Sequence, residues 1–280
     1  MSEVGLTTGT EALREAAIAY FKDTFQLSVI KIQEPIGKDL SWTPSFHFYL
    51  HDHLMVAVEV SEAAYPMILS LRRVDLEKLQ FPIAVYSVCP EETYLSDQKE
   101  AKRLINDGYG LLTVDKDGAV QKRASSIPIL QMIYEEEFRE RVKELPQTAR
   151  KRLAQCFDVY RQNAALGVSD ITEAFEGLVL KAGRAAVKKT WLEAKDVNPG
   201  NSSATLKAMQ ASSQFQNCAA AIGGAQGYIS NWRNLSHHFP KNPAKAAKKY
   251  RECKHGFIEG IQQIKSFREA LGHLGIKLPM

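Results

Sequence analysis

The first half of the chain alternates short apolar runs with amphipathic segments. Leu13, Ala17, Tyr20 and Phe21 recur at helical spacing and predict a helix over residues 11–25. Runs rich in β-branched and aromatic residues predict strands at 27–33, 46–50, 53–60 and 81–89. Two further helices are expected at 65–80 and at 96–109, the second with Ser96 as its N-cap, followed by a hairpin over 110–124 turning at Asp117 and Gly118. This order of elements is typical of a compact α/β domain.

Beyond residue 145, apolar positions recur at helical spacing in every long segment. The expected start signals are Pro146, Ser169, Ser203 and the pair Asn242-Pro243. The expected helices cover 147–165, 169–194, 203–221, 222–238 and 242–272. The charged stretch "EEEFRERVKELPQTARKRLAQ" is interpreted as a connector. We therefore predict an α/β domain over residues 1–142 and an all-α helix bundle over 145–280.

The charge of the chain is divided in the same way. Residues 1–144 carry 16 Lys and Arg against 23 Asp and Glu, a net −7, whereas residues 145–280 carry 20 against 9, a net +11. The overall +4 conceals this division. Because a basic surface attracts polyanions, we expect a nucleic-acid partner to bind the second half.

The composition excludes several other classes of protein. Apolar residues make up 45% and charged residues 24% of the chain, and the apolar runs are too short for a membrane span. The N-terminal residues lack a basic region followed by an apolar one, so we expect a cytoplasmic protein without membrane contact. The four cysteines are far apart, which argues against a zinc site or a disulfide framework and favours reduced, buried thiols. We expect no metal or cofactor.

The stretch "NWRNLSHH" contains the most specific motif of the second half. Arg233 and Asn234 are followed by His237 and His238, at the end of the penultimate long helix. This pattern resembles the signature of the HEPN superfamily (higher eukaryotes and prokaryotes nucleotide-binding), helix bundles in which an Arg, a polar residue and a later His form an RNase site. The earlier helix "ITEAFEGLVLKAGRAAVKKTW" resembles the acid-containing helix of such bundles. Arg268 and His273 satisfy the bare pattern too, but lack the polar neighbour, so we interpret that match as chance.

The resemblance implies a metal-independent reaction. Arg233 would bind the scissile phosphate and stabilise the charge of the transition state. His238 would act as general base or acid toward the ribose 2′-hydroxyl or the leaving oxygen, because an imidazole titrates near neutral pH. Asn234 would orient phosphate or imidazole, and His237 would share the acid-base work. A single Arg–His pair is a sparse site, so we expect two copies to combine in a homodimer. The non-catalytic alternative is that His238 caps the C-terminal end of a helix, where the helix dipole favours a cation.

Basic residues follow this motif immediately. Lys245, Lys248, Lys249 and Arg251 are grouped on the next helix and predict contact with the phosphate backbone of RNA, although such a helix is usually only a solvated face. Tyr228, Trp232 and Tyr250 are candidates for base stacking, but their helical spacing favours core packing.

The first half resembles the restriction-endonuclease-like fold of PD-(D/E)xK nucleases through "AVEVSEAAYPMIL", "FPIAVYSVCPEE" and "GYGLLTVDKDGAV". Pro44-Ser45 stands where that family has Pro-Asp, and Glu59-Val60-Ser61 stands where it has Glu-x-Lys. Only one of three key residues remains, so we expect a degenerate recognition or scaffold module. For Glu59 the structural interpretation is a strand-end carboxylate paired with Arg or Lys. His47, His51 and His53 alternate and could bind a metal, although a polar hairpin tip is the simpler interpretation.

The leading hypothesis is a homodimeric HEPN-like RNase of a prokaryotic toxin or antiphage system, with a possible partner protein bound through the first domain. A second hypothesis keeps the bundle as a non-catalytic dimerisation or partner-binding subunit of a defence complex. A third is a metal-dependent DNase that acts through Glu59 in the first domain.

Overall fold

The computed structural model describes residues 9–37, 42–62 and 81–278, so the helix expected at 65–80 lies outside the described residues. The chain divides into two compact units. Unit 1 consists of Met1–Tyr134 and Phe239–Arg251, and unit 2 consists of Glu135–His238 and Glu252–Met280. The division lies eight or more residues before the expected 142–145, and a short later segment returns to unit 1.

Unit 1 is built on a mixed sheet of six strands in the order β1-β2-β3-β4-β5-β6. The strands are β1 (Lys31–Ile32), β2 (Phe46–Leu50), β3 (Leu54–Val60), β4 (Ile83–Pro90), β5 (Gly110–Val114) and β6 (Val120–Ala124). The central pairs β3–β4 and β4–β5 are parallel, and the three outer pairs are antiparallel. The predicted strands are present, except that β1 is only two residues long instead of spanning 27–33.

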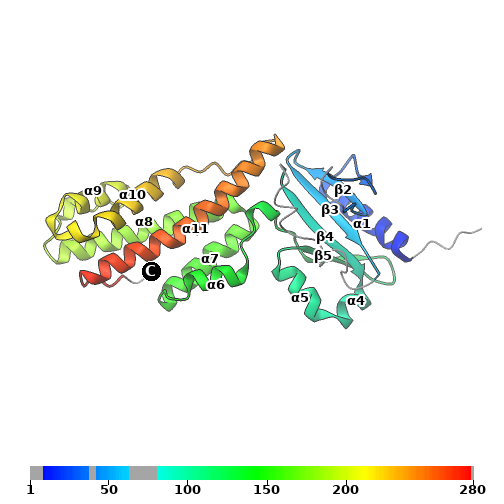
Figure 1. Cartoon of the computed structure of the whole chain (residues 1–280), viewed down its shortest axis with the longest axis horizontal. Coiled ribbons are helices and arrows are strands. Elements are labelled where there is room, and N and C mark those ends of the chain that lie inside the picture. The colour runs from blue at the N-terminus through cyan, green and yellow to red at the C-terminus, as the bar shows by residue number, and fades with distance from the viewer. Residues whose placement is uncertain (1–8, 38–41, 63–80, 279–280) are drawn as a thin grey trace, which may run out of the picture. The chain divides into compact units, whose positions relative to one another are not determined.

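Helices cover the two faces of this sheet (Figure 1). Helix α1 (Gly9–Phe25) packs Leu13, Ala17 and Phe21 on one face, and α5 (Gln98–Asn106) packs Ala101 and Leu104 on the other. Strand β3 contributes side chains to the apolar cores on both faces of the sheet, because alternate side chains of a strand point to opposite faces. Its apolar run therefore has no polar face, as expected for a central strand.

In unit 1 the predicted hairpin turn is confirmed, whereas the predicted N-cap of helix α5 is wrong. The hairpin between β5 and β6 turns as predicted, with Gly118 at φ +80°, a conformation that glycine adopts without strain. The helix expected at 96–109 corresponds to α5, and a separate helix that was not expected, α4 (Glu91–Ser96), precedes it. Asp97, not Ser96, is the N-cap of α5, because its carboxylate accepts a hydrogen bond from the Glu100 amide at 3.2 Å.

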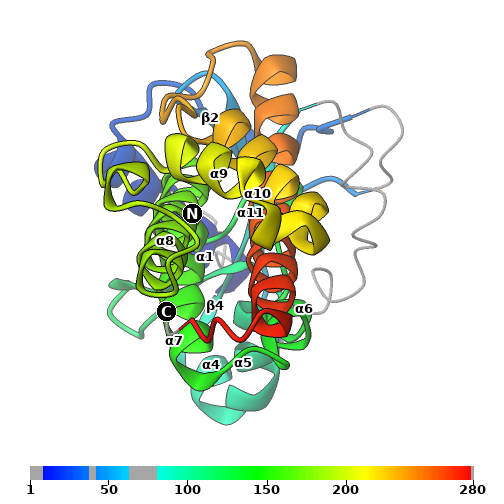
Figure 2. The same ribbon diagram turned by 90° about the vertical axis from the view of Figure 1, so that its left-hand side faces the viewer.

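Unit 2 is a bundle of helices, with α8 and α11 as its longest members (Figures 1 and 2). The helices are α6 (Glu135–Val142), α7 (Gln147–Gln162), α8 (Ala164–Lys188), α9 (Ser202–Ala211), α10 (Ala219–Trp232) and α11 (Pro243–His273). Helix α11 begins in unit 1 and continues in unit 2 from Glu252. The stretch interpreted as a connector contains α6. The helix expected at 203–221 ends earlier, as α9 at Ala211, and a 3-10 helix, Ser213–Cys218, lies between α9 and α10.

Three helices of unit 2, α8, α9 and α11, begin after side chains that accept a hydrogen bond from the first turn. Asn163 caps α8 and Asn201 caps α9, so the expected starts at Ser169 and Ser203 are wrong. Asn242 caps α11 through a 3.1 Å hydrogen bond from the Lys245 amide, as its position before Pro243 predicted.

Aromatic side chains fill the core of unit 2. Phe157 and Tyr160 of α7 contact Phe257 of α11, and Phe175 of α8 contacts Phe267, with ring centroids 4.5–5.9 Å apart. Tyr228, considered for base stacking, is 1% exposed, so packing is its role. All four cysteines are free and buried, as predicted.

Candidate functional site

Arg233 is the residue at which α10 ends. Its amide still donates to the Ile229 carbonyl at 3.0 Å, and it occupies the C-cap position in a helical conformation. The side chain is 44% exposed. Its Nε lies 3.4 Å from Oε1 of Glu176, and its Nη2 donates to the Gly200 carbonyl at 3.5 Å. The guanidinium is therefore held at the surface of unit 2 by two partners that come from other segments.

Glu176 belongs to this site but was not predicted from the sequence. It lies on α8, next to the buried Phe175, and its side chain is only 18% exposed. Ser202, in the first turn of α9, donates its hydroxyl to the same Oε1 at 2.9 Å. The available signal was the position of Glu176 beside Phe175 in the largely apolar stretch "ITEAFEGLVL", because a half-buried carboxylate needs partners. The end of α10, the middle of α8 and the start of α9 thus meet at one carboxylate.

The three other motif residues lie beyond the helix. Asn234, His237 and His238 are all exposed, in the connection between α10 and α11. The Ser236 hydroxyl accepts a hydrogen bond from the His238 amide at 3.3 Å. Helix α10 ends with Arg233 as its C-cap, so His238 is not the C-cap residue of that helix. Within the described residues, the Arg233 side chain forms an ion pair with Glu176 and a hydrogen bond with the Gly200 carbonyl. Neither of these partners is a histidine of the motif.

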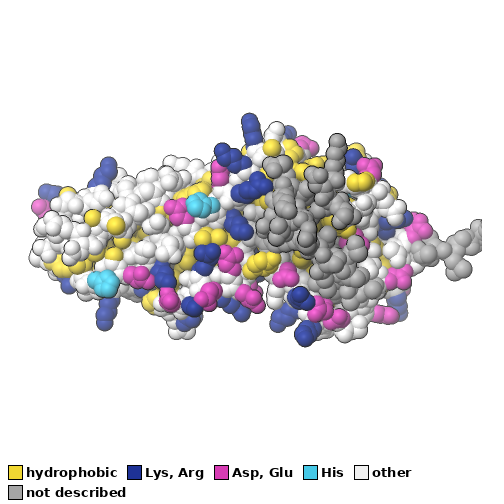
Figure 3. All heavy atoms as spheres, viewed as in Figure 1, with side chains coloured by type: hydrophobic (Ala, Val, Ile, Leu, Met, Phe, Trp, Pro, Cys, Tyr) yellow, Lys and Arg dark blue, Asp and Glu magenta, His cyan; other side chains and the backbone are white. Residues whose placement is uncertain are grey.

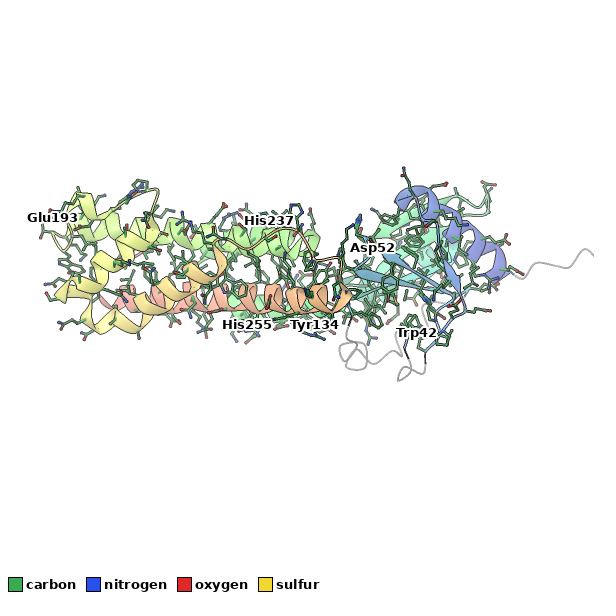
Figure 4. The ribbon with its side chains drawn as sticks, turned by 90° about the horizontal axis from the view of Figure 1, so that it is seen from above. Trp42, Asp52, Tyr134, Glu193, His237 and His255 are labelled. Carbon is green, nitrogen blue, oxygen red and sulfur yellow. The ribbon has the colours of Figure 1, made fainter. Side chains whose placement is uncertain are left out.

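Trp232, the residue directly before the motif, is held in place by contacts with α11. Its indole Nε1 donates to Oε2 of Glu259 on α11 at 3.1 Å, and the ring packs so closely on Gly256 that a Cβ there would lie 2.9 Å from it. His255 has its Nε2 3.6 Å from the same Glu259 oxygen. Figure 4 shows His237 and His255 on opposite sides of unit 2, so His255 does not join the motif. Trp232 is a packing residue that fixes where the motif begins.

The four predicted phosphate contacts belong to unit 1, whereas the motif belongs to unit 2. Lys245, Lys248 and Arg251 are exposed on α11. Lys249 differs, because it is 9% exposed and its ammonium lies 4.7 Å from the centre of the Phe239 ring. The structure thus places Lys249 in a buried cation–π contact and leaves the other three side chains open to solvent.

The charge excess of the second half is not collected into one patch on the face drawn in Figure 3. Lys and Arg side chains there are interspersed with Asp and Glu over unit 2.

The second match to the motif, Arg268 with His273, differs from the first in its surroundings. Arg268 is partly buried, with Nη1 lacking a hydrogen-bond partner, and burial lowers the pKa of its guanidinium.

Glu59 is the remaining nuclease-like residue of unit 1. Oε2 of Glu59 accepts a hydrogen bond from the Trp42 indole at 3.1 Å, and no Arg or Lys among the described residues forms an ion pair with this carboxylate. Burial raises the pKa of this carboxyl, and the indole hydrogen bond opposes that rise. The Ser45 hydroxyl accepts from the Val60 amide at 3.0 Å. The stretches Pro44-Ser45 and Glu59-Val60-Ser61 therefore lie side by side.

The three histidines near β2 do not form one row. His51 and Asp52 make the turn between β2 and β3 with φ of +52° and +59°, so the prediction of a polar hairpin tip is confirmed. His53 follows the turn, and its ring stacks on Phe239 with the centroids 5.7 Å apart. His47 lies within β2, is 3% exposed, and has a pKa lowered mainly by burial.

Among residues 9–37, 42–62 and 81–278, no group of three or more His, Cys, Asp or Glu side chains is arranged to hold a metal ion. No helix within these ranges is both long and apolar enough to cross a membrane. Comparison of the chain with protein-family models, curated proteins and solved structures found no match.

Proposed function

We propose that unit 2 is a metal-independent, HEPN-like endoribonuclease that acts through Arg233 and His238. The observation that carries the proposal is the exposed guanidinium of Arg233, held by the half-buried Glu176 and followed by an exposed histidine pair. An arginine that only stabilised the bundle would be expected to bury its ion pair further. Here the carboxylate is recessed, while the Arg233 side chain is 44% exposed and accessible to a phosphate.

The chemistry follows from these groups. His238 removes the proton of the ribose 2′-hydroxyl, and the 2′-oxygen attacks phosphorus while the bond from phosphorus to the 5′-oxygen breaks. Arg233 donates to the non-bridging oxygens, whose charge increases in the transition state. A second imidazole, from His237 or from another copy of the chain, protonates the leaving 5′-oxygen. The products are a 2′,3′-cyclic phosphate and a 5′-hydroxyl, and no metal is needed.

Glu176 is a positioning residue in this scheme. Its Oε1 receives both the Arg233 contact and the Ser202 hydroxyl, so it limits the orientations open to the guanidinium. Asn234 is next to Arg233 and exposed, and it is assigned to the substrate side. We include a homodimer in the proposal, because one chain contributes one Arg and a second acid is needed for the leaving group.

The test is RNA cleavage in EDTA by Arg233→Ala and His238→Ala. Each variant should lose about 100-fold or more of the activity, the contribution of one charged donor or one general base. Thermal stability should change little, because an exposed ion pair contributes about 0–1 kcal/mol. Arg184→Ala and His273→Ala, at exposed positions of the same unit, should retain wild-type cleavage. Mass measurement in solution should give a dimer for all five proteins.

Two alternatives have distinct outcomes in the same experiment. A non-catalytic partner-binding subunit would leave RNA intact in every protein, and the Arg233 variant would melt at a much lower temperature. A metal-dependent DNase in unit 1 would cleave DNA only with Mg²⁺ and would depend on Glu59. We favour a recognition or scaffold role for unit 1, because the Glu59 carboxylate is engaged by an indole and Ser45 is engaged by a backbone amide.

A further inference from the structure

A groove of about 650 Å³ runs between α6 and α7 in unit 2, away from the residues assigned to RNA cleavage. Helix α6 folds back on α7, since four residues join them and Phe138 stacks on Phe157 with ring centroids 4.3 Å apart. The volume lies within the range of about 300–1,000 Å³ typical of small-molecule sites.

The side chains that line the groove on α7 form one helical face. Gln147, Lys151, Ala154, Asp158 and Arg161 recur at intervals of three or four residues, which brings them to the same side of the helix. Arg150, three residues after Gln147 and four before Ala154, lies on this side as well. The floor is apolar, formed by Ala154 together with the edges of the stacked phenyl rings and Val142 of α6. The groove therefore combines a basic rim with an apolar base.

The cations are concentrated at one end. Lys143, Arg150 and Lys151 line the groove near the turn between the two helices. Arg150 and Lys151 are exposed and make no ion pair or side-chain hydrogen bond with any residue that the structure describes. Lys143 pairs with Glu140 at the rim. Two adjacent charges without acidic partners are an electrostatic cost to the folded chain, and that cost is relieved when an anion binds.

The opposite end is close to neutral. Arg139 pairs with Glu135 there, and Arg161 lies over the Phe157 ring near Asp158. Arg161 is about 16.5 Å from Arg150 along α7, at 1.5 Å per residue. The groove thus has a cationic end, an apolar floor and a neutral polar end.

We propose that this groove binds a small phosphate monoester with an aromatic or apolar body, with the phosphate at Lys143, Arg150 and Lys151. Arginine donates to phosphate in a bidentate geometry, and the adjacent lysines supply further charge. The apolar body covers Ala154, which is partly exposed, and removes its surface from water. A nucleic-acid strand fits less well, because Phe138 and Phe157 are 4–5% exposed and offer no ring face for base stacking.

The experiment measures binding of 4-methylumbelliferyl phosphate to the full chain by fluorescence anisotropy. The double variant Arg150→Glu/Lys151→Glu should bind it at least tenfold more weakly than wild type. This variant should fold, since both positions are exposed and lie near the N-terminal end of α7, where the helix dipole favours acidic residues. Arg150→Gln/Lys151→Gln, which removes the charges without reversing them, should also weaken binding.

The matched control is Arg184→Glu/Lys207→Glu, which makes the same change in net charge on exposed helix positions of unit 2. It should bind the probe as wild type does. The inference is overturned if both double variants lose binding equally, since that would be a general charge effect. It is also overturned if wild type does not bind the phosphate ester, or binds 4-methylumbelliferone as tightly. Binding of a labelled ten-nucleotide RNA that depends on Arg150 and Lys151, without binding of the ester, would identify the groove as an RNA track instead.

Discussion

Two carboxylates, Glu59 and Glu176, are partly buried by the fold and are stabilised in different ways. Glu176 has a cation and a hydroxyl within reach of one oxygen. Glu59 accepts a hydrogen bond from a neutral donor, the Trp42 indole (Figure 4), and burial raises its pKa. The neutral donor offsets only part of the loss of hydration, so burial disfavours the ionised form of Glu59.

Glu59→Gln should therefore change how stability depends on pH. A carboxyl whose pKa is raised in the folded state stabilises the fold below its unfolded pKa, and this contribution is lost as pH rises through the folded pKa. The free energy of unfolding of wild type, relative to that of Glu59→Gln, should fall across that interval above pH 4.5 and then stay constant.

Urea unfolding at a series of pH values measures this difference. Glu92→Gln, at an exposed position of unit 1, should give a difference from wild type that is nearly independent of pH. If Glu59→Gln behaved in the same way, burial would not dominate the ionisation of Glu59.

At the scale of elements, close approach between helices is permitted by particular glycines. A Cβ on Gly167 would lie 2.3 Å from Cα of Tyr160, a backbone atom at the end of the preceding helix α7. Gly177, on the same helix α8, has open space where its Cβ would be. The tight turn from α7 into α8 therefore depends on a missing side chain, whereas the second glycine only weakens its helix.

Gly167→Ala and Gly177→Ala should have opposite effects on stability. The first forces a backbone shift and should lower the free energy of unfolding by about 1–3 kcal/mol or more. The second should raise it by up to about 1 kcal/mol, the difference in helix propensity between alanine and glycine. Denaturant unfolding of both variants checks this, and a stabilised Gly167→Ala would show that α7 and α8 are further apart than described.

At the scale of the whole molecule, the two units are not consecutive pieces of the chain. Residues Phe239–Arg251 belong to unit 1 although the unit 2 helices precede and follow them. Phe239 and Tyr250 stack with ring centroids 4.2 Å apart, His53 stacks on Phe239, and Leu130 and Ala247 complete the cluster. The core of unit 1 is thus completed by residues remote in sequence.

Tyr250→Ala should loosen unit 1 specifically. Removing a large buried aromatic side chain costs about 3–5 kcal/mol, and Tyr250 is 6% exposed. Hydrogen exchange should become faster in β3 and in the 3-10 helix Ile129–Gln131, while the amides of α8 keep their protection. Tyr49→Ala, at a 44% exposed position of β2, is the control and should leave exchange nearly unchanged. Faster exchange limited to residues 243–251 would contradict the role given to this segment.

Local pattern was sufficient for most elements, because their signals lie within a few residues of one another. Asn242-Pro243 predicted the start of α11, and Asp117-Gly118 predicted the hairpin turn. Helix α6 was missed although its signal was present, since Glu135 and Glu137 pair with Arg139 and Arg141 at the i,i+4 spacing of a helix. Its high charge was given more weight than its periodicity.

The candidate site was predictable only in part, for a physical reason. Arg233 and His238 belong to one short stretch, and a motif within one stretch can be recognised locally. Glu176 and Ser202 are distant in sequence and meet Arg233 only because α8, α9 and α10 pack together. The buried position of Lys249 and the burial of Tyr250 in unit 1 depend likewise on contacts with remote residues.

The sequence by itself therefore determined the α/β first part, the helical second part and most helix and strand positions, since periodicity and capping act over a few residues. Tertiary structure alone decided which carboxylate holds Arg233, which lysine is buried, where the cations of the α6–α7 groove gather, and to which unit residues 239–251 belong. These outcomes depend on which surfaces exclude water together, a property of the packed chain and not of any one segment.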